Sequence, residues 1–121
     1  MTILDELIKE GFEPVTEWIR KGDRIGPKSF DWADHSGWLY AFVVEGEVKY
    51  IGLTTRVLRS RMSDYSHNRN SQTDDKRALV MEALSAGKQV HVFGRKHRDE
   101  VTLVTEEARL RALHVPSWNR I

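Results

Sequence analysis

The sequence predicts an α+β fold in which helices flank a small three-stranded antiparallel sheet, with an N-terminal helical extension. Two apolar runs, at residues 38–44 and 48–52, stand on either side of Gly46 and predict a β-hairpin. A third run with alternating polarity, at residues 89–94, predicts another strand. Segments with helical spacing occur before, between and after these strands, which indicates the α+β class.

Length and composition favour one ordinary domain. The chain has 121 residues, and 40% of them are hydrophobic, which is enough to bury a core. It contains no cysteine and no apolar run long enough to span a membrane, so we expect a cytoplasmic protein without a membrane partner. The formal net charge of +1 argues neither for nor against a polyanionic partner.

Residues 1–36 differ in character from residues 37–121, and we expect them to form the helical extension. Apolar residues recur at helical spacing between Thr2 and Gly11: Ile3, Leu4, Leu7 and Ile8. Thr2 or Asp5 is available to begin this helix, and Gly11 is suited to end it.

A second short helix is predicted after Gly11. Its apolar positions have helical spacing, and it ends near Gly22: Pro14, Val15, Trp18 and Ile19. We expect residues 22–37 to form a loop, because they include Gly26 followed by Pro27. Two aromatic residues of this loop, Phe30 and Trp32, are expected to dock on the core.

The predicted hairpin carries a tyrosine on each arm, Tyr40 and Tyr50. Side chains alternate between the two faces of a strand, so these tyrosines share a face only if paired residue numbers have an even sum. A three-residue loop at residues 45–47 gives that register, whereas a two-residue loop does so only with a bulge. We therefore expect the odd-length loop or a bulge.

A helix is predicted from about Thr54 to Tyr65, and Arg61 lies on its apolar stripe. Residues 66–75 are polar without periodicity and predict an exposed loop. The segment from residue 56 to residue 69 is rich in basic side chains and has one acid, Asp64. Its basic residues are Arg56, Arg59, Arg61, His67 and Arg69. Such a stripe and loop are suited to a phosphate backbone.

Two further helices are predicted, one around residues 78–84 that stops at Gly87 and one from Glu100 to His114. The last helix has Glu107 on its apolar face, and Glu106 lies close to that face. An acid on such a stripe is costly unless it is paired with an arginine or bound to a metal. Periodicity alone does not choose between the two glutamates.

The order of these residues resembles the GIY-YIG nuclease family over roughly residues 37–121. Residues 37–40 stand where the family has Gly-Ile-Tyr, although Trp38 and Leu39 replace the Gly-Ile pair. Residues 50–52 read Tyr-Ile-Gly and match the second element. Arg61 and Tyr65, four positions apart, are similar to the pair on the helix that follows in the family.

The C-terminal part of the resemblance rests on Glu107 and Asn119. Glu107 lies twelve residues before Asn119, with Pro116 between them, which looks like the metal-binding glutamate and closing Pro-x-x-Asn of the family. This spacing favours Glu107 over Glu106. The site residues that the resemblance implies are Tyr40, Tyr50, Arg61, Tyr65, Glu107 and Asn119.

The resemblance implies a metal-dependent endonuclease that hydrolyses DNA phosphodiester bonds. Glu107 is expected to bind Mg²⁺ or Mn²⁺, and Arg61 to hold the scissile phosphate. A tyrosine is expected to take a proton from the attacking water, and we favour Tyr40, with a nearby cation lowering its pKa. The side chains expected to contact DNA are Arg56, Arg59, His67 and Arg69.

Two other interpretations remain open at this level. The chain is alternatively a nucleic-acid-binding module that does not cleave, or a nuclease subunit that needs a partner protein. A homodimer that presents two sites is also compatible with the sequence. Binding alone requires basic side chains and no carboxylate facing the phosphate, so the presence of Glu107 favours an enzyme.

Overall fold

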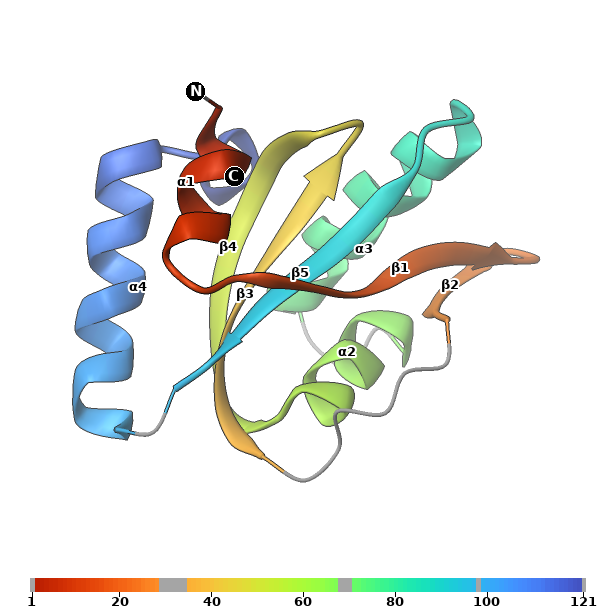
Figure 1. The fold of residues 1–121 in the computed structure, drawn as a ribbon. Coiled ribbons are helices and arrows are strands. Elements are labelled where there is room, and N and C mark those ends of the chain that lie inside the picture. Colours follow the sequence, from red (N-terminus) through yellow and green to blue (C-terminus); the bar gives the residue numbers. More distant parts are fainter. Residues whose placement is uncertain (1, 29–34, 68–70, 98, 121) are drawn as a thin grey trace.

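The structure is a computed structural model that describes residues 2–28, 35–67, 71–97 and 99–120. It confirms the α+β class, with an antiparallel sheet between two layers of helices (Figure 1). The sheet has five strands in the order β2-β1-β5-β3-β4, so the prediction of three strands was wrong. The strands are β1 (Glu13–Lys21), β2 (Arg24–Pro27), β3 (Ser36–Val44), β4 (Glu47–Val57) and β5 (Val90–Lys96).

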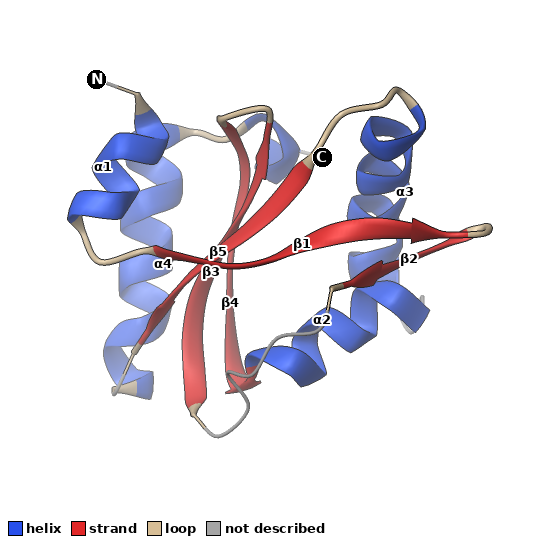
Figure 2. Ribbon diagram, turned by 45° about the vertical axis from the view of Figure 1, so that its right-hand side comes forward, coloured by secondary structure: helices blue, strands red, loops and turns tan. Residues whose placement is uncertain are grey.

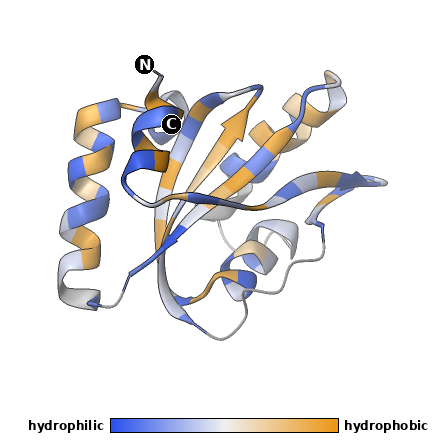
Figure 3. Cartoon of the chain, viewed as in Figure 1, coloured by the Kyte–Doolittle hydropathy of each residue, from blue (hydrophilic) through white to orange (hydrophobic). Residues whose placement is uncertain are grey.

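Helices cover both faces of the sheet (Figure 2). One face carries α1 (Ile3–Lys9) and α4 (Glu100–His114), and the other carries α2 (Leu58–His67) and α3 (Ser71–Ser85). A short 3₁₀ helix, η1 (Ser117–Arg120), follows α4 and packs against β4. The strand β3 is largely apolar (Figure 3), and its residues after Ser36 are all buried, because helices cover both faces of the sheet here.

The two faces of the sheet form two separate core clusters. Leu39, Ala41 and Ile51 pack with Leu103 and Leu110 of α4 on one face. The other cluster joins the sheet to α2 and α3, and it contains the aromatic residues Trp18, Trp38, Tyr40, Phe42 and Tyr65. Alternation along β3 therefore places Tyr40 on the side of α2 and α3, opposite the face that α4 covers.

The N-terminal segment contains one helix and a two-stranded hairpin. The first helix is confirmed as α1, and Thr2 and Asp5 form a capping box at its start. The second predicted helix was wrong, because this segment is β1, which pairs with β2 and β5. Part of the predicted loop is β2, whereas Phe30 and Trp32 lie outside the described residues. Residues 13–27 thus extend the same sheet that holds the tyrosines.

The middle of the chain also departs from the prediction at two boundaries. The strand β4 continues to Val57, since Thr54 pairs with Trp38, and α2 begins only at Leu58. The predicted exposed loop at residues 66–75 was wrong at its ends, because α2 extends to His67 and α3 begins at Ser71. The predictions of β5, of the helix before Gly87 and of α4 are confirmed.

A bulge sets the register of the hairpin formed by β3 and β4. The loop has two residues, Glu45 and Gly46, and both have positive φ, as tight hairpin turns require. The register shifts between the pairs Phe42–Tyr50 and Val43–Val48, which leaves Lys49 as the extra residue. The bulge that we expected as an alternative to the longer loop is confirmed, and Tyr50 therefore shares a face with Tyr40.

In the described part of the chain, the structure has no helix with the length and apolar character needed to cross a membrane.

Candidate active site

Three tyrosines meet under α2 and α3 at the end of the sheet formed by β3 and β4. Tyr40 comes from β3, Tyr50 from β4 and Tyr65 from α2. The ring centroid of Tyr40 lies 6.1 Å from that of Tyr50 and 6.3 Å from that of Tyr65. The hydroxyl groups of Tyr40 and Tyr65 are 2.7 Å apart and hydrogen-bonded. We call these three residues the tyrosine cluster.

The members of the tyrosine cluster differ in their access to water. Tyr40 and Tyr65 are buried, whereas Tyr50 is only half-buried. Burial raises the pKa of the Tyr40 phenol and of the Tyr65 phenol well above the ordinary value, and Arg61 offsets this only in part. The expected lowering of the pKa of Tyr40 was therefore wrong, because burial outweighs the neighbouring cation.

Gly52 makes room for the Tyr40 phenol. Gly52 pairs with Tyr40 in the sheet, and a Cβ atom at this position would lie 2.7 Å from Cζ and 2.8 Å from the hydroxyl oxygen of Tyr40. The same Cβ atom would lie 3.0 Å from a ring carbon of Tyr50. The last residue of the Tyr-Ile-Gly element thus has a steric role, which is to let two rings lie over the strand.

Arg61 joins the tyrosine cluster from α2. Its Nε donates a hydrogen bond of 3.2 Å to the Tyr40 hydroxyl, and its Cζ lies 5.2 Å from the centroid of the Tyr65 ring. Burial acts against the charge of this guanidinium, but the phenols of Tyr40 and Tyr65 outweigh it and raise the pKa of Arg61. Arg61 therefore remains charged beside the phenols.

Asp64 holds two of the predicted phosphate-binding arginines. It is the one acid of the basic stripe, and its side chain is buried. Its carboxylate forms an ion pair with Arg56, from the end of β4, and accepts a longer bond of 3.5 Å from Arg61. Because one carboxylate contacts both guanidinium groups, it fixes their separation and leaves part of Arg56 exposed to solvent.

Lys76 is a site residue that the sequence interpretation missed. It lies on α3, is only 7% exposed, and places its Nζ 5.5 Å from the centroid of the Tyr50 ring. A lysine is rarely buried to this extent in a core. The signal that could have revealed it is its spacing of four and seven residues from Val80 and Ala83, which are also buried.

Asn119 fixes the free edge of β4. Its Oδ1 accepts a hydrogen bond from the Ile51 amide, and its Nδ2 donates one to the Ile51 carbonyl, each at 2.8 Å. β4 is the outermost strand, so these backbone groups have no neighbouring strand on that side. The amide therefore anchors the residue that stands between Tyr50 and Gly52.

The two candidate glutamates of α4 have different surroundings. Glu106 is bound by Arg95 of β5 and by Arg109, at 3.2 Å and 2.6 Å. The Arg109 hydrogen bond, with a further one from Arg95, lowers the pKa of Glu106 to about 2. Glu107 is 16% exposed and accepts one bond of 3.5 Å from Arg111 of the same helix. Glu106 is thus bonded to two arginines, whereas Glu107 has more free capacity on its carboxylate oxygens to bind a metal.

The structure brings some of the predicted site residues together and places others elsewhere. Arg61, Tyr40 and Tyr65 contact one another directly, and Tyr50 lies against Tyr40. Glu107 belongs to α4, which packs against β4 from the face of the sheet opposite the tyrosine cluster. Its one ion pair among the described residues is with Arg111, so the structure does not bring its carboxylate into contact with the phenols. Arg59 lies on the exposed side of α2, Arg69 lies outside the described residues, and the side chain of His67 is not described.

A metal site made only of protein ligands is absent from the described ranges, where His, Asp and Glu form no cluster of three. A tetrahedral zinc site therefore does not fit these residues. A single carboxylate fits Mg²⁺, which keeps several water molecules and takes further ligands from a substrate phosphate. Glu107, with one long hydrogen bond to Arg111, meets that requirement.

Comparison with solved structures identifies nucleases of the same fold. Bacteriophage T4 EndoII, a GIY-YIG endonuclease solved as a variant with one glutamate replaced by alanine, matches with a TM-score of 0.74 and 27% identity. The match covers 95% of this chain and 97% of that chain. Restriction endonuclease HPY188I in complex with product DNA matches with a TM-score of 0.60 and 19% identity, over 81% of this chain and 62% of that chain.

Comparison of the sequence with protein families and with curated proteins gave no match. The likeness to T4 EndoII confirms the resemblance stated from the sequence, and it extends over residues 1–36 as well as the later elements, since nearly the whole chain is covered.

Proposed function

We propose that this GIY-YIG-type chain is an endonuclease that hydrolyses phosphodiester bonds of DNA at the tyrosine cluster, with a bound divalent metal. The observation that carries the proposal is the contact between Arg61 and the phenols of Tyr40 and Tyr65, on a fold shared with T4 EndoII. Burying a charged arginine is costly in a structural core, whereas phosphate hydrolysis uses a cation to stabilise the phosphoryl oxygens.

Arg61 is proposed to hold the scissile phosphate. Hydrolysis accumulates charge on the phosphoryl oxygens, and a guanidinium offers two parallel donors to them. Nε is bound to Tyr40 and one terminal nitrogen faces Asp64, so the direction of the fork is set before DNA binds. A lysine at this position would keep the charge and lose the fork.

Tyr50 is proposed as the group that takes the proton from the attacking water, in place of Tyr40. Tyr40 is fully buried, and its phenol is already bonded to Tyr65 and Arg61. Tyr50 is half-buried, and Lys76 provides a positive charge beside its ring.

Glu107 is proposed to hold the metal, Mg²⁺ or Mn²⁺. When bound, such a metal supplies positive charge to the phosphate and to the departing oxygen. Asn119 supports the site by fixing the backbone at Ile51, and Arg56 and Arg59 are proposed to contact flanking phosphates together with His67 and Arg69. Residues 1–36 are proposed to act as an extension of the nuclease domain of residues 37–121, within the same sheet.

The test is incubation of the chain with supercoiled plasmid, linear duplex, branched DNA and single-stranded DNA, with Mg²⁺ and with chelator. We expect metal-dependent cleavage of at least one substrate by the parent chain and none by Glu107→Ala. Glu106→Gln is the matched control, because it removes the neighbouring charge on the same helix and should retain cleavage at neutral pH.

Two outcomes would contradict parts of the proposal. Tight DNA binding by the parent without cleavage in any metal would favour the non-cleaving module, or a subunit that needs a partner. Cleavage that persists in Glu107→Ala and disappears in Glu106→Gln would transfer the metal-binding role from Glu107 to Glu106.

A further inference from the structure

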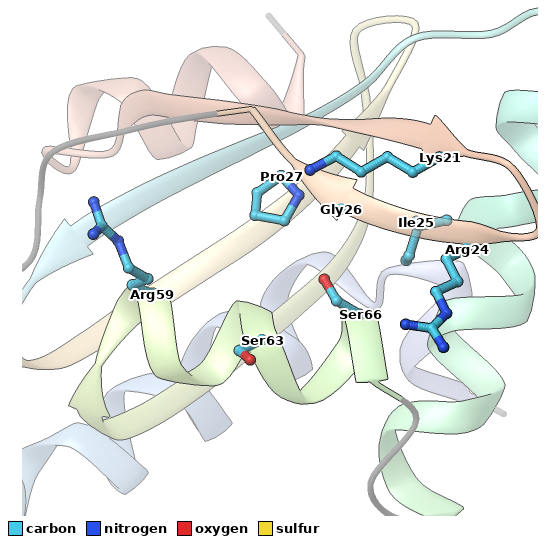
Figure 4. A pocket seen from close by; sticks show the side chains of 8 residues that line it. All are labelled: Lys21, Arg24, Ile25, Gly26, Pro27, Arg59, Ser63 and Ser66. Atoms are coloured by element: carbon cyan, nitrogen blue, oxygen red, sulfur yellow. The ribbon is translucent and has the colours of Figure 1, made fainter.

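A groove of about 350 Å³ separates the β1–β2 hairpin from α2 (Figure 4). Its walls are β2 on one side and the outer side of α2 on the other. It is lined by Lys21, Arg24, Ile25, Gly26, Pro27, Arg59, Ser63 and Ser66. None of the residues of the tyrosine cluster borders it, so the groove is separate from the proposed active site.

The groove is basic and carries hydroxyl groups. Three of its lining residues are cations, Lys21, Arg24 and Arg59, and none of the described lining residues is acidic. Figure 4 shows Arg59 and Arg24 at the two ends of the groove, with the serine side chains between them. Cations combined with hydroxyl donors around a concave surface are the side chains that bind phosphate oxygens in protein–DNA contacts.

The side chain of Lys21 lies along the groove because position 26 is a glycine. A Cβ atom at Gly26 would lie 3.0 Å from Cε and 3.1 Å from Nζ of Lys21. The ammonium group thus lies beside β2. Ser66 donates a hydrogen bond of 3.3 Å to the Met62 carbonyl, which is long enough for the hydroxyl to turn toward a ligand.

The groove and Arg61, the arginine proposed to hold the scissile phosphate, lie on opposite sides of α2. Arg59, Ser63 and Ser66 are spaced by four and three residues, so they lie on one side of the helix. Arg61 and Asp64 lie on the other side, toward β4 and Tyr40. A helix with its side chains is about 10–12 Å wide. A DNA strand advances about 3.4 Å per nucleotide, so the helix spans about three nucleotides.

We infer that this groove binds a backbone phosphate of the DNA substrate, about three nucleotides from the phosphate held by Arg61. The inference rests on the proposed function and adds a second phosphate site, made by the N-terminal hairpin and α2. Such a contact fixes the position of the duplex without reading its sequence. It also gives residues 21–27 a role in DNA binding. The net charge of +1 for the whole chain does not indicate this role.

The experiment measures duplex binding by fluorescence anisotropy, in chelator so that no cleavage occurs, at several salt concentrations. The test variant is the full chain with Lys21→Gln, Arg24→Gln and Arg59→Gln. The matched control carries Lys88→Gln, an exposed lysine outside the groove. A second test variant, Ser63→Asp, places a negative charge in the groove and leaves all three cations in place.

We expect the triple variant to bind at least about tenfold more weakly at low salt. The slope of log K against log salt concentration should become less steep by about one for each phosphate that the protein no longer binds. Ser63→Asp should weaken binding as well, and Lys88→Gln should bind within about twofold of the parent. In Mg²⁺, the triple variant should require more DNA than the parent for half-maximal cleavage.

Two results would contradict the inference, and they separate a failure of the groove proposal from a failure of the proposed active site. If the parent binds and cleaves DNA while the triple variant and Ser63→Asp keep its affinity and salt dependence, neither the groove nor Arg59 binds a phosphate. The proposed cleavage at the tyrosine cluster would still stand. If the parent neither binds nor cleaves any DNA, the proposed function fails and this inference fails with it. Thermal unfolding of each variant near the parent temperature verifies that the exposed substitutions preserve the fold.

Discussion

At the scale of single residues, the structure places the three site tyrosines, which the sequence does not distinguish, in different surroundings. Tyr40 and Tyr65 form a buried, hydrogen-bonded pair, whereas Tyr50 reaches the surface beside Lys76. This difference supports the proposal that Tyr50 reacts while Tyr40 and Tyr65 hold the framework of the site. The sequence located all three and could not separate them, because burial depends on α2 and α3 packing over the hairpin.

Substitution of phenylalanine for each tyrosine should separate these roles. We expect Tyr50→Phe to lower the cleavage rate at saturating DNA by about 10² to 10⁴, with little change in stability, because a proton acceptor is removed. Tyr40→Phe should lower the free energy of unfolding by about 1–2 kcal/mol, since Tyr65 and Arg61 each lose a buried partner. Single-turnover kinetics and urea denaturation are the measurements. A larger rate loss in Tyr40→Phe than in Tyr50→Phe would reverse the assignment.

Gly52→Ala tests the close approach of the two rings to β4. The new methyl group would meet the Tyr40 phenol at 2.7 Å, so the ring must move and its bonds to Tyr65 and Arg61 must lengthen. We expect a loss of about 1–3 kcal/mol in the free energy of unfolding and a large loss of cleavage. Thr55→Ala, an exposed change on the same strand, is the control. Unchanged cleavage in Gly52→Ala would show that the phenol position is not critical.

At the scale of elements, local patterns predicted the strands of the central hairpin, the strand β5 and four of the helical segments, whereas long-range pairing decided β1 and β2. The segment with Val15 and Trp18 fits a helical spacing, but it pairs with β5, more than seventy residues later in the chain. Only Trp18 of β1 is fully buried, so the strand lacks the clean alternation that would have indicated it. Sequence spacing could not reveal a partner so distant.

The packing of α4 also depends on a charged network that no local pattern predicts. Arg95 of β5 and Arg109 of α4 both bind Glu106, and Arg109 also binds Glu10, which follows α1. The network therefore connects three elements on the face of the sheet that lies opposite the tyrosine cluster. Its side chains are partly exposed, so the network contributes only modestly to the free energy of unfolding at high salt.

This network predicts that the protein loses stability in acid. The pKa of Glu106 is lowered to about 2 in the folded chain, from an ordinary value of 4.5, first by Arg109 and then by Arg95. A lowered folded-state pKa gives stability that is complete above about 4.5 and is lost as the pH falls toward 2. We expect about 1–2 kcal/mol to be lost over this window after allowance for solvent screening.

Urea denaturation at a series of pH values measures this loss. Glu106→Gln should be less stable than the parent at pH 7 and should approach it at low pH, because the variant has no carboxylate to protonate. A constant difference between the two proteins across the window would show that the network contributes no pH-dependent stability.

At the scale of the whole molecule, one five-stranded sheet brings together a hairpin with two motif tyrosines and an N-terminal hairpin with a basic groove. The sequence predicted the first, because its Tyr-Ile-Gly element and the arginine on the following helix are short-range signals. It did not predict the groove or Lys76, since both arise where elements distant in the chain come together. The division into an N-terminal extension of residues 1–36 and a nuclease domain of residues 37–121 stays a prediction.

The most direct test of the whole account is the rate at which the purified chain nicks supercoiled plasmid in Mg²⁺, compared with its Arg61→Lys variant. We expect the parent to nick the plasmid and the variant to do so at a rate at least about 100-fold lower. Plasmid binding should stay within about threefold, because the charge remains while the two parallel donors of the guanidinium are lost. No nicking by the parent under any metal condition, or equal rates for the two proteins, would contradict it.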